Sequence, residues 1–237
     1  MIKVELGEVW GWHHALRGMR NPMNSWDGAD SDIERGFIGK NDADLMRRLY
    51  NGGAVHRKYL RQVFVSADIT APLYWWKEYD TYKVGTTANS CSTMHKIAAK
   101  PFELDDFSYE HLLDDPVYHV FSPDKDIEKE VIWYDDEYPN SALDVLDFVI
   151  KALNQFRELY LETKDKRYWW QMIQLLPSSY NQKRTVTFSY ENAVTMIEQR
   201  TGHKLDEWNE FVAQLKTLPF MDILLNQDQK DGVPDEE

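Results

Sequence analysis

The chain has 237 residues and a mass of 28.0 kDa, which allows one large domain or two small ones. Hydrophobic residues make up 43% of it and charged residues 28%, as in a folded protein and unlike a disordered one. The single cysteine, Cys91, excludes an internal disulfide framework and an all-cysteine metal site. No apolar run is long enough for a membrane span and the first residues lack a signal-peptide pattern, so we expect a cytoplasmic protein with no membrane association.

The net charge of −13 is distributed unevenly along the chain. Residues 101–140 carry a net charge of −11 and residues 228–237 one of −4, which leaves +2 for everything else. This distribution leaves room for a local pocket that binds an anion, but no basic stripe is large enough to neutralise several phosphates of a nucleic acid. We therefore predict no nucleic-acid partner, and we interpret both acidic stretches as solvated surface, with residues 226–237 as a disordered tail.

The N-terminal part of the chain predicts a strand, a long loop and a helix. Residues 1–10 alternate well enough for a strand, whereas residues 11–39 are rich in Gly, Asn, Asp and Ser and indicate mainly an ordered loop. A short helix is expected over residues 41–50, with Asn41 or Asp42 as its N-cap.

The next stretch predicts a second strand, and polar residues follow it. Apolar residues alternate over 62–69, and Pro72 ends this strand. The segment 73–80 is densely aromatic, and residues 85–92 are small and polar, as is typical of a turn.

The clearest helix of the chain begins after the acidic stretch, at Asn140 or Ser141. Ser141 and Asp144 have the spacing of a capping box, in which each side chain accepts a hydrogen bond from the other residue's backbone. One apolar stripe then follows at helical spacing and consists of Leu146, Val149, Ile150, Leu153, Phe156 and Tyr160.

The C-terminal part predicts three more helices and a strand. The helices are expected over residues 165–176, 191–200 and 205–218, and the β-branched strand over 185–188. Since no internal repeat or long linker occurs, the pattern predicts one α+β domain over residues 1–225, with a mixed sheet packed against helices.

The histidines give no indication of a metal site. The seven of them are scattered, and no pair has the spacing that places two ligands on one face of a helix. We therefore predict no bound metal.

A phosphate group would have to be held by side chains, because neither of the common glycine-rich phosphate loops occurs. Guanidinium groups suit this task, since each can donate two parallel hydrogen bonds to phosphate oxygens. The candidate cations are Arg17, Arg20, Arg57, Arg61, Lys77, Lys83, Lys183, Arg184 and Arg200.

Cys91 allows two interpretations. It lies shortly before His95, and a thiolate beside an imidazolium would be an activated nucleophile. Alternatively, the cysteine is a small buried side chain, and the polar residues around it cap a helix or form a turn.

Two blocks of the chain resemble the flavin-dependent thymidylate synthases. That family commonly has a helix, a His about fifteen residues before an Ala-Pro pair, aromatic residues, and then the signature Arg-His-Arg-x-x-Ser-x-Asn-Glu-x-Ser-x-Arg. Here His56 follows the first predicted helix and precedes the pair Ala71-Pro72 by 15 residues. The aromatics are in segment 73–76, and the signature region corresponds to residues 81–95.

The signature aligns in two registers that differ by one inserted residue. In one register residues 81–83 take the place of Arg-His-Arg and Thr86 that of the first Ser; in the other, Asn89 and Ser92 match the Asn and the second Ser. Neither register places an Arg in the triplet. Lys83 is its one possible cation, and a lysine lacks the two-pronged geometry of a guanidinium.

The second block lies near the C-terminus. Pro177 and Tyr180 precede an extended piece and then the predicted helix 191–200, which ends in Arg200 and is followed by His203. In the family, the Arg at the end of this helix contacts the uracil nucleotide. Together the two blocks cover about 95 of the 237 residues.

The resemblance implies a flavin-dependent thymidylate synthase-like α+β domain that methylates dUMP to dTMP, with FAD as cofactor and a methylene folate as co-substrate. It also implies a homotetramer whose active sites form between subunits. The catalytic residues would be Arg200 and Ser92. The cofactor-binding residues would be His56, Arg61, Lys77, Tyr82 and Lys83. The substrate-binding residues would be Thr86, Asn89, Ser90, Ser92, Lys183 and Arg200.

Two other functions stay open on the sequence. One is a catalytically altered or inactive relative that binds a nucleotide or a protein partner, since the Arg-His-Arg triplet is absent. The other is a different enzyme on the same scaffold that uses Cys91 with His95.

Overall fold

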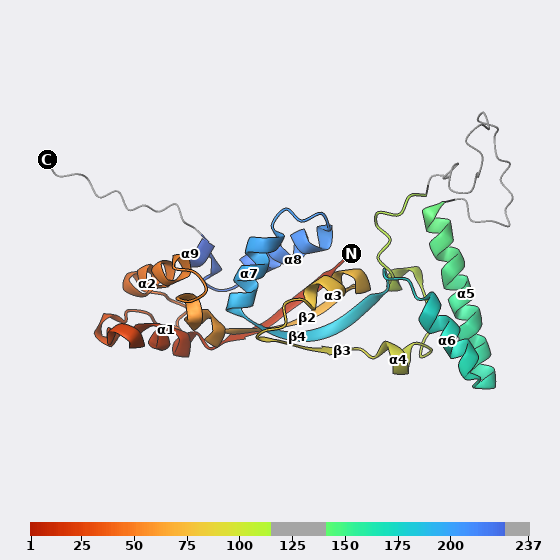
Figure 1. The fold of residues 1–237 in the computed structure, drawn as a ribbon, viewed down its shortest axis with the longest axis horizontal. Helices are drawn as coiled ribbons and strands as arrows, with labels where there is room; N and C mark the ends of the chain where they lie inside the picture. The colour runs from red at the N-terminus through yellow and green to blue at the C-terminus, as the bar shows by residue number, and fades with distance from the viewer. Residues whose placement is uncertain (115–140, 226–237) are drawn as a thin grey trace, which may run out of the picture. The chain divides into compact units, whose positions relative to one another are not determined.

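The computed structural model describes residues 1–114 and 141–225 (Figure 1). It has the predicted α+β architecture, within which the chain forms two compact units. The larger unit contains Ile2–Thr70, Lys77–Ser90 and residues 183–225; the smaller contains Met1, Ala71–Trp76 and the described part of Cys91–Gln182. The predicted tail, 226–237, and most of the acidic stretch lie outside the described residues.

A four-stranded sheet has the strand order β1-β2-β4-β3 (Figure 1). Its strands are β1 (Lys3–Trp10), β2 (Phe64–Pro72), β3 (Thr86–Ser90) and β4 (Asn181–Ser189). The pairs β1–β2 and β3–β4 are antiparallel, so the structure specifies an antiparallel sheet where the sequence predicted a mixed one. Along β2, Val65, Ala67 and Ile69 are buried, and the residues between them are partly exposed, which confirms the predicted alternation.

The helices confirm most of the predicted positions. They are α1 (Trp12–Arg20), α2 (Lys40–Asn51), α3 (Leu73–Tyr79), α4 (Thr93–Lys96), α5 (Ala142–Thr163), α6 (Lys166–Leu175), α7 (Tyr190–Arg200), α8 (Asp206–Lys216) and α9 (Met221–Leu225). A short 3-10 helix, η3 (Arg57–Gln62), precedes β2. No helix within residues 1–114 and 141–225 is long and apolar enough to cross a membrane.

Two segments differ from the prediction because tertiary partners outweigh local propensity. Residues 11–39 begin with helix α1 rather than a loop, since Trp12, Ala15, Leu16 and Met19 are spaced along one helix face and are all buried. Residues 85–92 were expected to form a turn, but Thr86–Ser90 is strand β3, because β4 supplies a full set of backbone partners.

A buried ionic cluster ties α1 and α2 to the loop between them. Asp42 is 1% exposed and accepts hydrogen bonds from Arg20 Nε at 2.7 Å and from Ser31 Oγ at 2.6 Å. The backbone N–H groups of Asp30 and Ser31 donate to its second oxygen at 3.1 Å each. Burial by itself would raise the pKa of Asp42, but the hydrogen bonds from Ser31 and Arg20 outweigh it and lower the pKa below its ordinary value.

The core of the larger unit contains a cluster of aromatic rings. Helices α7 and α8 pack on the sheet, and the ring of Phe211 on α8 lies 6.3 Å from that of Phe188 on β4 (Figure 1). The rings of Tyr79 and Trp208 lie 6.1 and 6.0 Å from Phe211. All four side chains are buried, so this cluster fixes the end of α3 and helix α8 relative to β4 within this unit.

The smaller unit is built around α5 and α6. The predicted capping box is confirmed: Ser141 Oγ accepts from the backbone of Asp144 at 3.0 Å, and the Asp144 carboxylate accepts from the backbone of Ser141 at 3.1 Å. The predicted apolar stripe of α5 faces the core of this unit, where the buried residues are Ile97, Phe102, Phe107, Leu146, Ile150, Leu153 and Met172.

Candidate functional site

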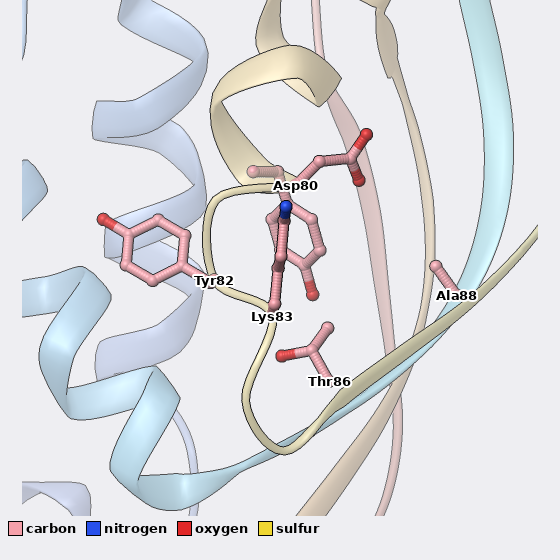
Figure 2. A pocket seen from close by; sticks show the side chains of 6 residues that line it. Asp80, Tyr82, Lys83, Thr86 and Ala88 are labelled. Carbon is pink, nitrogen blue, oxygen red and sulfur yellow. The ribbon is translucent and has the colours of Figure 1, made fainter.

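A pocket of about 180 Å³ opens in the larger unit where the end of α3 turns into β3 (Figure 2). Its lining residues are Tyr79, Asp80, Tyr82, Lys83, Thr86 and Ala88. The turn is held by backbone hydrogen bonds from Thr81 to Glu78 and from Tyr82 to Tyr79. It offers an aromatic ring, a hydroxyl group and charges of both signs, which suits a small polar ring that carries an anionic group.

The register of β3 decides which of its residues face the pocket. Thr86 lies opposite Phe188, Ala88 opposite Val186 and Ser90 opposite Arg184. Because side chains alternate along a strand, Ser90 shares the pocket face with Thr86 and Ala88, whereas Asn89 lies on the opposite face. The structure therefore places Asn89 on the other face from Thr86 and Ser90, with which the sequence analysis grouped it as a substrate-binding residue.

Asn192 positions Thr86 at the pocket. Its side-chain nitrogen donates to Thr86 Oγ1 at 2.8 Å and to the carbonyl of Val84. Asn192 lies in the first turn of α7, which is capped by the hydroxyl of Ser189. Sequence reasoning missed Asn192, although Ser189-x-x-Asn192 at the start of a predicted helix is a capping pattern that could have drawn attention to it.

Arg200, the last residue of α7, contacts Tyr82, one of the residues that line the pocket. Its Nε donates to the Tyr82 hydroxyl at 2.9 Å, and Tyr82 lines the pocket. The guanidinium carbon lies 4.6 Å from the ring centre of Trp208 and 5.6 Å from that of Tyr82. These contacts hold the guanidinium in one orientation at the helix C-terminus, although 18% of its side chain remains exposed.

The charge of Arg200 is balanced by Glu78, a residue that sequence reasoning missed. Arg200 Nη1 and Glu78 Oε2 are 2.6 Å apart. The same carboxylate oxygen accepts from Trp208 Nε1 at 3.1 Å and lies 3.6 Å from His203 Nε2. No local signal marks this pairing, because Glu78 and Arg200 are 122 positions apart in the chain.

Arg184 and Lys183 are neighbours on β4, so their side chains lie on opposite faces of the sheet. Arg184 pairs with the pocket residue Asp80 at 2.8 Å. Lys183 pairs with Asp68 at 2.9 Å, on the face that also carries Asn89. Hydrogen bonds from Thr185 and from Lys183 lower the pKa of Asp68. The structure thus places Lys183 away from Thr86 and the pocket.

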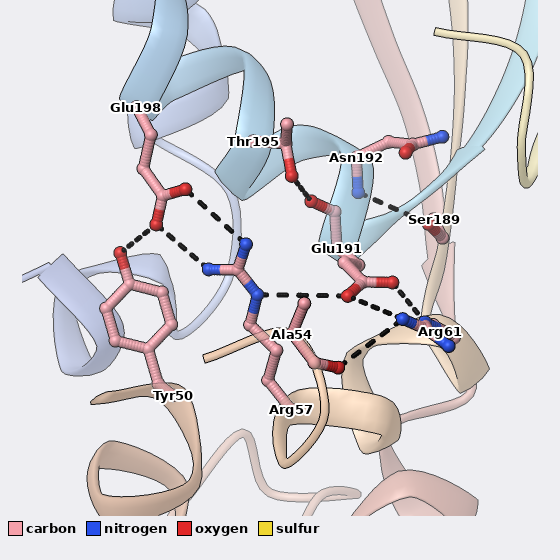
Figure 3. Close-up of polar contacts among 9 residues, drawn as sticks. All are labelled: Tyr50, Ala54, Arg57, Arg61, Ser189, Glu191, Asn192, Thr195 and Glu198. Carbon is pink, nitrogen blue, oxygen red and sulfur yellow. Dashed lines mark hydrogen bonds and ion pairs between the residues drawn. The ribbon is translucent and has the colours of Figure 1, made fainter. Parts of the chain in front are cut away.

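Arg57 and Arg61 belong to a second ionic cluster, between η3 and α7 (Figure 3). Both nitrogens of the Arg61 fork, Nε and Nη2, donate to Glu191, the latter at 3.1 Å. Arg57 donates to Glu198 at 2.9 Å, and so does the hydroxyl of Tyr50 at 3.0 Å. Burial and the adjacent Glu198 raise the pKa of Tyr50 to about 12. Because Arg61 donates two hydrogen bonds to Glu191, its guanidinium already has a carboxylate partner.

The other predicted site residues are exposed. His56 precedes η3, and Lys77 lies exposed in the last turn of α3. Lys83 is exposed at the pocket. Neither lysine is in an ion pair with any residue of 1–114 or 141–225, which distinguishes them from Arg57, Arg61, Arg184 and Arg200.

Ser92 and Cys91 belong to the smaller unit. Ser92 caps α4, where its hydroxyl accepts from the backbone of His95 at 3.2 Å. Cys91 is exposed, so the interpretation as a small buried side chain is wrong, while the interpretation of this stretch as a helix cap is confirmed. Within the described residues, no three His, Cys, Asp or Glu side chains are grouped so that they could hold a metal ion.

Comparison with known proteins yields a likeness in structure. No protein-family description and no curated protein matches the sequence. Two crystal structures of thymidylate synthase X from Helicobacter pylori, each with FAD and dUMP, match the fold with a TM-score of 0.62. They are 17% and 18% identical to this chain, and the matches cover 96% and 95% of it and 98% of each of the solved chains. The chain therefore has the fold of the flavin-dependent thymidylate synthases.

Proposed function

We propose that this protein binds a uracil nucleotide and a flavin and acts as a flavin-dependent thymidylate synthase that converts dUMP to dTMP. The observation that carries the proposal is Arg200, a rigidly oriented arginine at the end of α7 whose partner Tyr82 lines a pocket. The fold likeness to thymidylate synthases that hold FAD and dUMP supports it.

The pocket suits the nucleotide. Thr86 and Ser90 on its face of β3 supply hydroxyl groups that can donate to or accept from a pyrimidine edge. Lys83 supplies a cation with no carboxylate partner among the described residues, and Arg200 supplies a guanidinium for the negative charge of the base or phosphate. In this role Arg200 orients the substrate and stabilises charge that develops on the pyrimidine.

For the flavin, the fit is partial within one chain. A cavity of about 180 Å³ is smaller than the ~300 Å³ and more that drug-sized ligands occupy, so it can take one ring system and not a whole FAD. Bound flavin in its reduced form would supply the hydride, and a methylene folate the carbon. Tyr82, Lys83, Lys77 and His56 are the exposed or partly exposed residues that would contact the flavin, and we expect a neighbouring subunit of a homotetramer to complete the site.

A second candidate function is nucleotide binding without thymidylate synthesis. It is favoured by the absence of the Arg-His-Arg triplet, because the other arginines are already paired and do not freely replace it: Arg200 is paired with Glu78, Arg184 with Asp80 and Arg61 with Glu191. A phosphate that meets a paired arginine gains less than one that meets an unpaired arginine, because the existing ion pair must be broken first.

The visible spectrum of the purified protein separates the two functions. An active synthase should be yellow, release flavin on denaturation, and form dTMP from dUMP when methylene folate and a flavin reductant are added. A colourless protein that dUMP stabilises against heat indicates the second function. A colourless protein whose thermal midpoint responds neither to FAD nor to dUMP contradicts both.

A further inference from the structure

We infer that Glu78 is a built-in competitor for the anion site formed by Arg200, and that it sets how tightly this protein binds a phosphate-bearing ligand. The inference rests on the proposed function as far as the identity of that ligand is concerned. It assigns a specificity-determining role to a residue that lies outside the pocket lining.

The carboxylate of Glu78 sits where an anionic ligand would find its donors. One oxygen of Glu78 receives hydrogen bonds from Arg200 at 2.6 Å and from the indole of Trp208 at 3.1 Å, with His203 Nε2 at 3.6 Å. A guanidinium and an indole N–H that converge on one oxygen are donors of the kind that bind phosphate, and the imidazole of His203 lies next to them. In this structure the anion they hold is part of the protein.

The donors have contacts other than Glu78 that hold them in place. Arg200 stacks on Trp208 at 4.6 Å and donates to Tyr82 through Nε, so its orientation does not depend on the carboxylate. Trp208 is fully buried in the aromatic cluster with Phe211. Glu78, by contrast, is 35% exposed near the end of α3, so its side chain can turn into water and regain hydration.

A neighbouring pair repeats the arrangement. Two residues further along, Asp80 neutralises Arg184 at 2.8 Å. Both Arg184 and Arg200 are therefore paired with a carboxylate from the same short segment, so neither offers an unpaired guanidinium to the pocket. A phosphate must displace Glu78 from Arg200 before it can form the charge-assisted contact, and this competition lowers its affinity.

The test is the affinity of the full chain for dUMP, measured by calorimetric titration of the wild type and of Glu78→Gln. Glutamine keeps the size of the side chain and removes its charge, so we expect dUMP to bind about tenfold more tightly or better. The double variant Glu78→Gln, Arg200→Gln should lose this gain, which would show that it acts through Arg200. Asp44→Asn is the matched control, because it removes one carboxylate that pairs with Arg47 and neither lines the pocket nor contacts Arg200.

The outcomes separate this inference from the proposed function. If the wild type binds dUMP and Glu78→Gln binds it equally well, the inference is wrong and the proposed function stands. If neither binds dUMP, the proposed function fails, and titration with inorganic phosphate decides the inference: tighter binding by Glu78→Gln that depends on Arg200 supports it, and equal binding refutes it. Should Glu78→Gln fail to fold, Glu78→Asp, which withdraws the carboxylate by one methylene, should give a smaller gain in the same direction.

Discussion

Removal of the buried carboxylate of Asp42 is expected to lower the free energy of unfolding strongly, because both of its oxygens accept hydrogen bonds. Asp42 is 1% and Arg20 5% exposed, and together with Ser31 and the backbone they form a buried hydrogen-bonded cluster. The change Asp42→Ala would leave the Arg20 guanidinium buried without its counter-ion. Removing one partner of a buried ion pair costs about 3–5 kcal/mol, because the remaining charge is neither hydrated nor compensated.

Urea unfolding followed by circular dichroism measures this loss. For a slope of about 2–3 kcal/mol/M, a loss of this size lowers the midpoint by about 1–2.5 M. Asp44→Ala on the same helix is the control: Asp44 pairs with Arg47 at 2.9 Å, both side chains are about two-fifths exposed, and we expect a loss of about 0–1 kcal/mol. If Asp42→Ala is no more destabilising than Asp44→Ala, the reasoning from burial is refuted.

The same residue predicts a dependence of stability on pH. The pKa of Asp42 is lower in the folded protein than in the unfolded chain, so its contribution is complete above about pH 4 and is lost as the pH falls through the folded-state pKa. We therefore expect the wild type to lose more stability between about pH 4 and pH 2 than Asp42→Asn does. Parallel acid profiles of the two proteins would contradict this assignment.

Three further predictions concern the backbone, the second ionic cluster and the site. Gly11 has φ +100°, and a Cβ there would lie 2.0 Å from the carbonyl oxygen of Gln62, so Gly11→Ala should lower the thermal midpoint strongly; an unchanged midpoint would show that this close approach is not maintained. The pKa of Tyr50 is raised to about 12, so its contribution to stability is present below about pH 10 and is lost from there up to about pH 12. Ultraviolet titration of Tyr50→Phe should lack one tyrosine that titrates near pH 12 in the wild type, and an unaltered titration would refute the placement against Glu198. Arg200→Lys keeps the charge but not the fork, so dUMP affinity should fall about tenfold with the fold intact by circular dichroism; unchanged affinity would remove Arg200 from the site.

The helices show how far local patterns reach. The capping box at Ser141 and the stripe of Leu146, Ile150 and Leu153 depend on residues three and four positions apart, and the structure confirms both. The apolar face of α1 was equally local, at Trp12 and the buried positions that follow it, but its loop-like composition concealed it. Composition is a weaker signal than periodicity when the two disagree.

The candidate site depended on information that local patterns do not carry. The chain alone indicated an α+β fold, the absence of a glycine-rich phosphate loop and the retained arginine at position 200. It could not indicate that Arg200 meets Glu78 across 122 positions, nor that Asn89 and Lys183 lie on the other face of the sheet from Thr86. Electrostatic partners and strand register are set by packing between distant segments, whereas helix caps and apolar stripes are set by neighbours along the chain, and for this reason the elements were predictable and the charge balance of the pocket was not.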